Sequence, residues 1–255
     1  AIGYQTGGAV TTGTNNTFVG ALAGDGTDDG GSNVAVGSSA LSANCGSSNT
    51  AVGVSALTSS TGATNTAFGF QAGANATSAN NNVFLGRDSG ITGSPGGNVT
   101  TAGGILCVGD ENIGAAHVQV DWTVASDARD KTDFTALDLG LDFVKALAPV
   151  TYKWDKRSKY GDKSADGYDL NAQTPDGTHK EDWLDIGFKA QEVEALEIAA
   201  GYNKDNNTNL VSSHTEDGKQ MGLQYSKFVP ILVKAIQEQQ TLIESLTARI
   251  ETLEG

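Results

Sequence analysis

A short repeat in the first half of the chain limits its fold more than any other feature. Each copy reads Asn, then β-favouring residues, then Gly, and the repeated glycines are spaced 17, 17, 16, 16 and 17 residues apart. A unit of this length is too short for a helical hairpin, so it predicts one coil of a β-solenoid with two short strands per coil. The five clear copies lie at residues 16–20, 33–37, 49–53, 65–69 and 82–86, and a degenerate copy lies at 105–109.

The two fixed positions of the repeat have physical interpretations. The glycine indicates a backbone conformation or a close approach that a Cβ would forbid. The asparagine suits a turn, and stacked asparagines would form a ladder along the solenoid. The apolar positions are mostly Ala and Val, with one Phe or Leu per copy. A core this thin favours an oligomer in which several chains share it.

The repeat resembles the left-handed β-roll head of trimeric autotransporter adhesins and the similar Asn-Thr-Ala-x-Gly repeats of phage tail fibres. The resemblance covers residues 1–110. It implies a trimer and a role in surface binding, and it identifies no receptor.

Composition divides the chain in two. Of the 33 glycines, 24 precede Ser126. The same residues, 1–125, contain only one Lys or Arg, which is Arg87. We therefore expect a solenoid over residues 1–112, a connecting strand and cleavage junction over 113–125, and an α+β domain over 126–255. The net charge of −14 argues against nucleic acid or an anionic membrane as a partner, and no apolar run has the length of a membrane span. Because the chain opens inside a repeat, we expect it to be part of something longer.

Few residues suggest a metal or cofactor, and we expect neither. The loop of Asp25, Asp28 and Asp29 reads as a solvated acidic turn, with a calcium site as the alternative. Cys45 and Cys107 are too far apart for a metal motif and read as small buried residues.

The hexapeptide from Ser126 to Lys131, Ser-Asp-Ala-Arg-Asp-Lys, marks the junction between the halves. Alternating apolar residues over 117–124 predict a strand leading into it. A serine hydroxyl needs a base to act as a nucleophile, and a lysine can serve if its pKa is lowered. Arg129 would favour that lowering, whereas Asp127 and Asp130 would oppose it if they contacted the amine. Ser and Lys at this spacing also arise by chance, with a solvated loop as the alternative.

Several ordered segments resemble the intramolecular chaperone auto-processing domain, the peptidase S74 family, found at the C-termini of phage tail spikes and fibres. They are the Ser-Asp-x-Arg-x-Lys string, Leu-Ala-Pro-Val-Thr-Tyr-Lys-Trp at 147–154, Gly-Phe-Lys-Ala-Gln-Glu-Val at 187–193 and Gly-Leu-Gln-Tyr at 222–225. The resemblance implies self-cleavage between Ala125 and Ser126, with Ser126 as nucleophile, Lys131 as base, and Asp127 and Arg129 in positioning roles. The family often has a polar residue where this chain has Ala125.

Downstream, apolar spacing predicts helices over 134–147 and 191–200, a strand over 150–154 and polar loops over 155–182 and 202–219. The last segment, 226–254, shows heptads that predict a coiled coil, with a core-packing amphipathic helix as the alternative. Isoleucine and leucine in the seam alone favour a coiled coil of two helices, whereas Gln239 in the seam and the expected trimeric solenoid favour three helices. The seam residues are Ile236, Gln239, Ile243, Leu246, Ile250 and Leu253.

Together these features favour a piece of a phage tail fibre whose C-terminal domain is a self-cleaving trimerisation chaperone. The expected partners are two further copies of the chain, upstream fibre or baseplate components, and a host cell-surface receptor, with a glycan as one candidate. The expected location is the virion tail, after assembly in the host cytoplasm. One alternative is a structural fibre whose chaperone never cuts and stays as a permanent cap. Another is a glycan-degrading enzyme, against which stands the lack of a paired-carboxylate cleft in residues 1–112.

Overall fold

The computed structural model describes residues 1–163, 165–206 and 208–255. The chain forms two compact units. The first comprises residues 1–115, 154–182 and 214–220, and the second comprises 116–153, 183–213 and 221–255. Two stretches of the C-terminal half therefore fold with the repeats.

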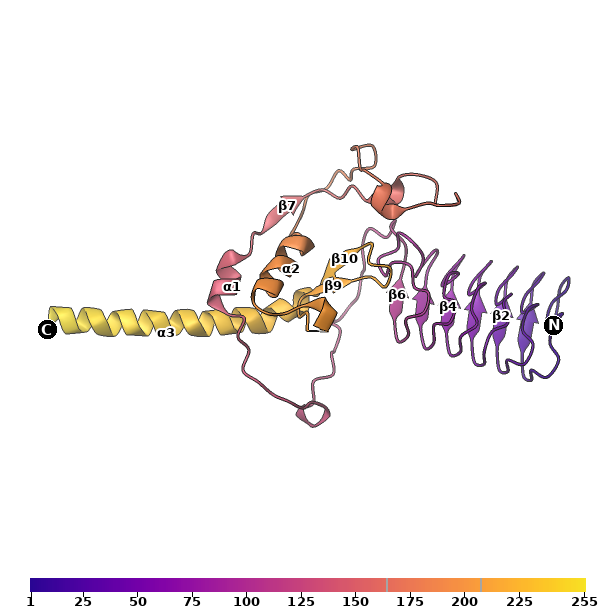
Figure 1. Ribbon diagram of the computed structural model, residues 1–255, viewed down its shortest axis with the longest axis horizontal. Helices are drawn as coiled ribbons and strands as arrows, with labels where there is room; N and C mark the ends of the chain where they lie inside the picture. Colours follow the sequence, from indigo (N-terminus) through magenta and orange to yellow (C-terminus); the bar gives the residue numbers. More distant parts are fainter. Residues whose placement is uncertain (164, 207) are drawn as a thin grey trace. The chain divides into compact units, whose positions relative to one another are not determined.

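The first unit contains the predicted β-solenoid. Each clear repeat supplies one three-residue strand, and the strands stack in parallel in chain order (Figure 1). Equivalent residues pair in register, as in Phe18 with Ala35 and Ala67 with Phe84. The strands are β1 (Thr17–Val19), β2 (Val34–Val36), β3 (Thr50–Val52), β4 (Thr66–Phe68), β5 (Val83–Leu85) and β6 (Leu106–Val108).

The second strand expected in each coil does not form. The small-residue segment after each repeat glycine is a turn, because left-handed residues interrupt it. Leu22 and Gly24 have φ of +58° and +61°, and Leu57 has φ of +50°. Alternation between left- and right-handed dihedrals curls the backbone, which a strand cannot tolerate. The alanine between the left-handed residues, such as Ala23 or Ala56, is fully buried.

The predicted asparagine ladder is present. The side-chain oxygen of each repeat asparagine accepts a hydrogen bond from the backbone N–H of the equivalent residue one coil later. Asn49 N–H donates to Asn33 Oδ1 at 2.8 Å, and Asn65 N–H donates to Asn49 Oδ1 at 2.9 Å. The Asn49 amide also donates to the carbonyls of Gly46 and Gly62. These buried amides are therefore satisfied, as burial requires.

The repeat glycine is needed for both reasons that the sequence suggested. Gly53 has φ of +140°, and a Cβ at this position would lie 2.2 Å from the carbonyl oxygen of Gly69 in the next coil. The neighbouring coils therefore approach at a distance that only glycine permits.

The solenoid core is narrow. Ala35, Ala51 and Ala67 lie in one column of it, and alanine is also the commonest of its other residues. Cys45 and Cys107 are buried and unpaired, which confirms their reading as small core residues. The larger core residues are Phe18, Leu41, Leu57, Phe84 and Val99.

The second unit is a small α+β assembly that carries a long C-terminal helix. Its helices are α1 (Leu141–Ala146), α2 (Ala190–Ala199) and α3 (Phe228–Glu254), and β7 (Val150–Tyr152) pairs antiparallel with β8 (Asp185–Gly187). A further pair, β9 (Ser212–His214) and β10 (Met221–Leu223), forms a hairpin. The short 3₁₀ turns of this unit are η1 (Ala128–Asp130), η4 (Lys204–Asn206) and η5 (Tyr225–Lys227), whereas η2 (Arg157–Lys159) and η3 (Leu170–Ala172) belong to the first unit.

The helix predicted over 134–147 is wrong in its first half. Only Leu141–Ala146 is helical, because the backbone of Gly140 before it lies outside the helical region (φ −138°, ψ −134°). Glu238 accepts a hydrogen bond from Leu141 N–H at 2.7 Å and so substitutes for the missing N-cap side chain.

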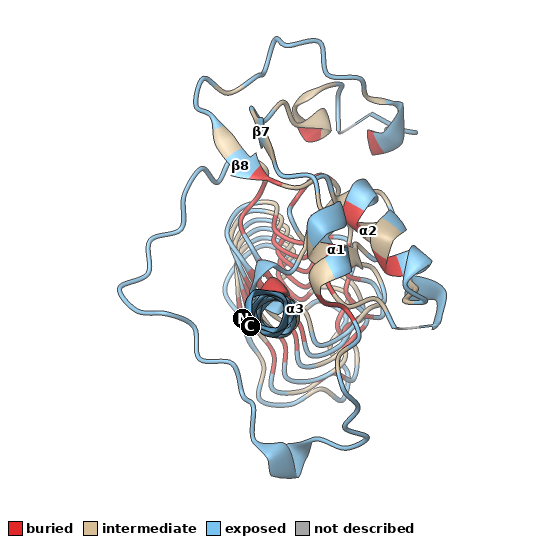
Figure 2. Ribbon diagram, turned by 90° about the vertical axis from the view of Figure 1, so that its left-hand side faces the viewer, coloured by how far each residue is buried: buried red, intermediate tan, exposed pale blue. Residues whose placement is uncertain are grey.

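Helix α3 is continuous over 27 residues (Figure 1). Only its first turns pack inward, through Phe228, Ile231 and Ala235, and from residue 239 onward every residue is exposed (Figure 2). No helix in the described residues is both long enough and apolar enough to span a membrane.

Candidate functional site

The structure brings together the two residues that the sequence pairs. Lys131 Nζ lies 2.6 Å from Ser126 Oγ and donates a hydrogen bond to it. The same ammonium lies 3.4 Å from the Ser126 carbonyl oxygen. A serine hydroxyl within hydrogen-bond reach of an amine is the geometry required of a nucleophile and its general base.

The turn between them is built by Asp127 and Arg129. Asp127 caps η1 by accepting a hydrogen bond from Arg129 N–H at 2.9 Å. The Arg129 guanidinium folds back on the same carboxylate, with Nη2 at 2.6 Å from Oδ2. Hydrogen bonds from the Arg129 side chain and backbone lower the pKa of Asp127. The single 3₁₀ turn, closed by Lys131 N–H donating to Ala128 O, returns the lysine toward the serine.

Asp127 and Arg129 therefore pair with each other instead of acting on the amine. The sequence left open whether the arginine or the aspartate would influence Lys131 more strongly. In this geometry the guanidinium charge is offset by its own partner, and both residues shape the turn.

The whole segment around the site is exposed. Every residue from 112 to 136 is open to solvent, including Trp122 and Val124, each 77% exposed. The strand predicted over 117–124 does not form in this single chain, because no neighbouring strand pairs with it. Its alternating apolar side chains consequently have nothing to pack against.

The other segments that carried the resemblance build the core of the second unit. Phe188 stacks on Phe228 with ring centroids 5.3 Å apart and on Tyr225 at 6.4 Å. Gly187 is required by this cluster, since a Cβ there would lie 2.4 Å from the Tyr225 hydroxyl. Val193, from the same motif, is 1% exposed. These residues therefore pack the core of the second unit.

A buried carboxylate was missed by the sequence reading. Glu197 is 1% exposed and accepts hydrogen bonds from the N–H groups of Leu210, Val211 and Ser212 and from the Ser212 hydroxyl. Burial alone would raise the pKa of Glu197, but the donors from Ser212, Val211 and Leu210 outweigh it and lower the pKa. This carboxylate therefore ties α2 to the segment leading into β9.

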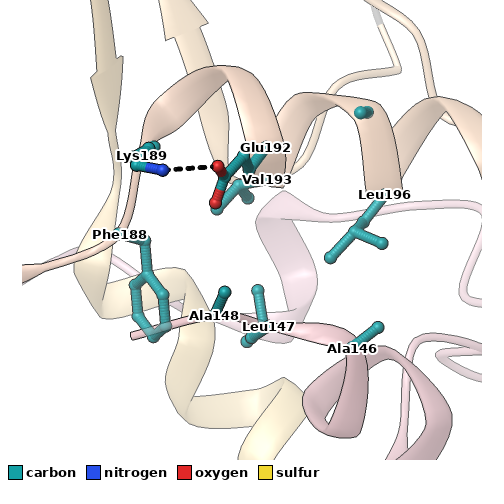
Figure 3. Close-up of a pocket in the computed structure, with 9 residues that line it drawn as sticks. Ala146, Leu147, Ala148, Phe188, Lys189, Glu192, Val193 and Leu196 are labelled. Atoms are coloured by element: carbon teal, nitrogen blue, oxygen red, sulfur yellow. Dashed lines mark hydrogen bonds and ion pairs between the residues drawn. The ribbon is translucent and has the colours of Figure 1, made fainter. Parts of the chain in front are cut away.

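The second unit also contains a small apolar pocket of about 270 Å³ between the end of α1 and helix α2 (Figure 3). Leu147 and Leu196 line it, and Lys189 and Glu192 form an ion pair of 2.7 Å at its edge. It includes neither Ser126 nor Lys131 and holds no nucleophile, so it does not suggest a second reaction.

Within the described residues, no group of three or more His, Cys, Asp or Glu side chains is placed to hold a metal ion. In the acidic loop, Asp28 accepts a hydrogen bond from Thr11, and its N–H donates to Asn44 Oδ1 at 2.9 Å. The calcium alternative for this loop gains no support from these contacts.

The predicted seam residues of α3 share one exposed stripe. Ile236 is 63% exposed, Leu246 is 55% exposed and Leu253 is 86% exposed. The alternative of a core-packing helix applies only to the first turns, because Phe228 and Ile231 are the large buried side chains.

One segment of the chain matches a known protein family. Residues 126–202 match the peptidase S74 family model, described as Chaperone of endosialidase. The match begins at Ser126 and includes η1, α1, β7, β8 and α2, and it leaves out the solenoid, β9, β10 and α3. No curated protein and no solved structure matches the chain.

Proposed function

We propose that the chain is part of a phage tail fibre whose C-terminal domain assembles three copies and then cuts itself free between Ala125 and Ser126. The observation that carries the proposal is the 2.6 Å contact between Lys131 Nζ and Ser126 Oγ, at the residue where the match to the chaperone family begins.

The outer face of the solenoid sheet supports an assembly of several chains. The strand register aligns the third residue of every strand in one column on the side opposite the buried core. Phe68 in this column is 45% exposed and Val108 is 56% exposed. A continuous apolar stripe of this kind marks an association surface. The column consists of Val19, Val36, Val52, Phe68, Leu85 and Val108.

Helix α3 supports the same conclusion. A single amphipathic helix with its apolar stripe in water gains little from propensity alone, and most helical stability in proteins comes from packing of that stripe. Burial of the seam residues between three copies would supply the packing. The coiled coil would then bring three low-hydrophobicity solenoids into register, which lowers the entropy cost of their non-local contacts.

The proposed cut proceeds in two balanced steps. Ser126 Oγ attacks the carbonyl carbon of Ala125, and the hydroxyl proton passes to the neutral amine of Lys131. The bond from the Ala125 carbon to the Ser126 nitrogen breaks, and that nitrogen takes the proton back from the lysine. The resulting ester is hydrolysed by water, which leaves a carboxylate on Ala125 and restores the hydroxyl of Ser126.

Assembly would also control when the cut occurs. A lysine acts as a base only when neutral, a form that removal from water favours. In the single chain the segment is exposed on all sides, whereas packing of the apolar residues of 117–124 between copies would cover it. Cutting would follow assembly, and removal of the assembly domain would make unfolding kinetically irreversible.

The remaining roles follow from this reading. The solenoid would be the virion-borne shaft or tip that contacts a host receptor, and fibre or baseplate components upstream would anchor it. Assembly would take place in the host cytoplasm.

Mass spectrometry of the purified protein tests the proposal. The denatured wild-type sample should contain a species beginning at Ser126, and the native sample should contain trimers. Ser126→Ala and Lys131→Arg should both remain full length, since arginine keeps the positive charge but does not act as a base. Ser226→Ala, an exposed serine in η5, serves as the matched control and should cut normally. A wild-type chain that stays intact in trimers would instead support the permanent structural cap.

A further inference from the structure

The last coil of the solenoid has an edge whose backbone N–H groups have no following coil to supply their hydrogen-bond acceptors. In the turn before each strand, backbone N–H groups donate to a carbonyl one coil later. Thr61 and Gly62 both donate to Thr77 O, at 2.7 and 3.1 Å, and Thr77 N–H donates to Thr100 O at 2.8 Å. Thr100 lies in the turn before β6, the last strand of this sheet. An open edge of this kind exposes unpaired backbone donors.

Glu216 occupies the place of the missing coil. Its Oε2 accepts a hydrogen bond from Thr100 N–H at 2.8 Å, and its Oε1 accepts one from Thr101 N–H at 2.8 Å. Both threonine hydroxyls donate to Oε1 as well, at 2.8 and 2.7 Å. Residues 214–220 belong to the same compact unit as the solenoid.

Side-chain oxygens already replace carbonyls inside the solenoid. Asp28 N–H donates to Asn44 Oδ1, and Ala63 N–H donates to Asn80 Oδ1 at 2.8 Å. Glu216 extends this substitution beyond the final coil, with two oxygens for two donors.

The neighbouring residues fit the same surface. Asn98 N–H donates to Asp217 Oδ2 at 3.3 Å. Gly97 allows the approach, because a Cβ there would lie 2.4 Å from the Cβ of Thr215. Asp217 Oδ1 accepts hydrogen bonds from Thr215 Oγ1 and Lys219 N–H, which fixes the turn that presents Glu216.

The electrostatics of Glu216 agree with this geometry. Partial burial alone would raise its pKa, but the hydrogen bonds from Thr101 and Thr100 outweigh it and lower the pKa to about 2. Four donors converging on one carboxylate have this effect.

We propose that Glu216, assisted by Asp217, is an end cap that replaces the next coil, and that Thr100 and Thr101 form the carboxylate-binding site through which the solenoid holds residues 214–220. This inference adds to the proposed function and rests on it in one respect. After a cut before Ser126, Thr100 and Glu216 would belong to different molecules, so this contact would have to open before the cut domain could leave.

Hydrogen exchange of the full-length chain tests the cap. The experiment uses the Ser126→Ala background, in which the covalent chain stays intact. In Glu216→Gln one carboxylate oxygen becomes an amide nitrogen, so either Thr100 or Thr101 loses its acceptor. We expect the exchange of at least one of these two amides to accelerate about tenfold, with Thr77 in the preceding coil unchanged.

Two further variants complete the test. Glu216→Ala should accelerate both amides, and Glu251→Ala, at an exposed glutamate of α3, should accelerate neither. Exchange at Thr100 and Thr101 that stays within twofold of the parent in Glu216→Gln would overturn the cap. That result is separate from the proposed cleavage, which is decided by the mass of the chain that retains Ser126.

Discussion

The solenoid and the C-terminal helix solve the problem of stability in opposite ways. In the solenoid, backbone hydrogen bonds and the asparagine ladder repeat from coil to coil around a narrow core in which small residues predominate. In α3, the last sixteen residues make no inward contact, and the apolar side chains lie open to water. The first region is satisfied largely within one chain. The apolar stripe of the second would be buried only in the proposed trimer.

This difference suggests a division of labour. Polar groups that must match coil by coil give the solenoid a fixed register, and apart from its outer apolar column it has little hydrophobic drive toward assembly. The helix stripe supplies that drive in a segment whose own backbone hydrogen bonds are local. In the proposed trimer, the helix would provide most of the association and the solenoid the regular geometry.

The largest effect is expected from a variant that disrupts the apolar stripe of α3, which is proposed to hold the copies together. Ile243→Asp places a charge in the helix seam, and we expect the native mass to fall from trimer to monomer. Thr241→Asp adds the same charge outside the seam and should leave the trimer intact. A trimer that survives Ile243→Asp would place the association surface elsewhere.

The second test breaks the close approach of coils. Gly53→Ala forces a side chain into a left-handed conformation and against Gly69 O. Backbone strain alone should cost about 1–3 kcal/mol, and the clash should add to it, seen as a lower midpoint in denaturant unfolding. Gly114→Ala is the matched control, because a Cβ there meets nothing within 4 Å. Equal stability of the two variants would contradict the glycine argument.

The third test concerns the second unit. Glu197→Gln leaves one buried oxygen to serve four donors, and we expect it to cost about 2 kcal/mol of unfolding free energy. Glu192→Gln, on the same helix, is the comparison variant and should cost much less, because its ion pair with Lys189 is exposed to solvent. If both cost the same, Glu197 is not what ties α2 to the segment before β9.

The smallest expected effect is a pH dependence from the end cap. The folded-state pKa of Glu216 is lowered from 4.5 to about 2, so its stabilisation is fully present above pH 4.5 and is lost as the pH falls through about 2. The difference in unfolding free energy between the parent and Glu216→Gln should be constant near neutrality and shrink below pH 4.5. A difference that instead grows on acidification would mean that the carboxylate is not bound in its ionised form.

Repetition explains why the solenoid could be predicted from sequence. Five copies of one pattern place a glycine equivalent to Gly53 and an asparagine equivalent to Asn49 at the same positions. The structure confirms that the glycine allows a close approach of neighbouring coils and that the asparagines form a ladder. The second strand per coil was predicted wrongly because positive φ at Leu22 or Leu57 leaves no trace in residue type. Leucine normally avoids that region, and only stacking between coils selects it.

The site shows the same limit. The spacing of Ser126 and Lys131 also arises by chance, so it was the family motif around them that paired the two residues, and one 3₁₀ turn spans the distance between them. Glu197 and Glu216 could not be found, because their donors lie 13 to 15 and 115 to 116 residues away in the sequence. The strand expected over 117–124 failed for a related reason, namely that a strand needs a partner that the pattern of one segment cannot supply.

The ladder also tolerates unequal coils. Successive rungs join residues 16 or 17 positions apart, yet the last rung, from Ile105 N–H to Asn82 Oδ1, spans 23 and keeps a length of 2.8 Å. The extra residues of the last coil are therefore accommodated without lengthening this rung. A solenoid of this kind can accept loops of different length in individual coils while the spacing between its strands stays the same. Its surface can therefore diversify in evolution without a change in the stack of strands.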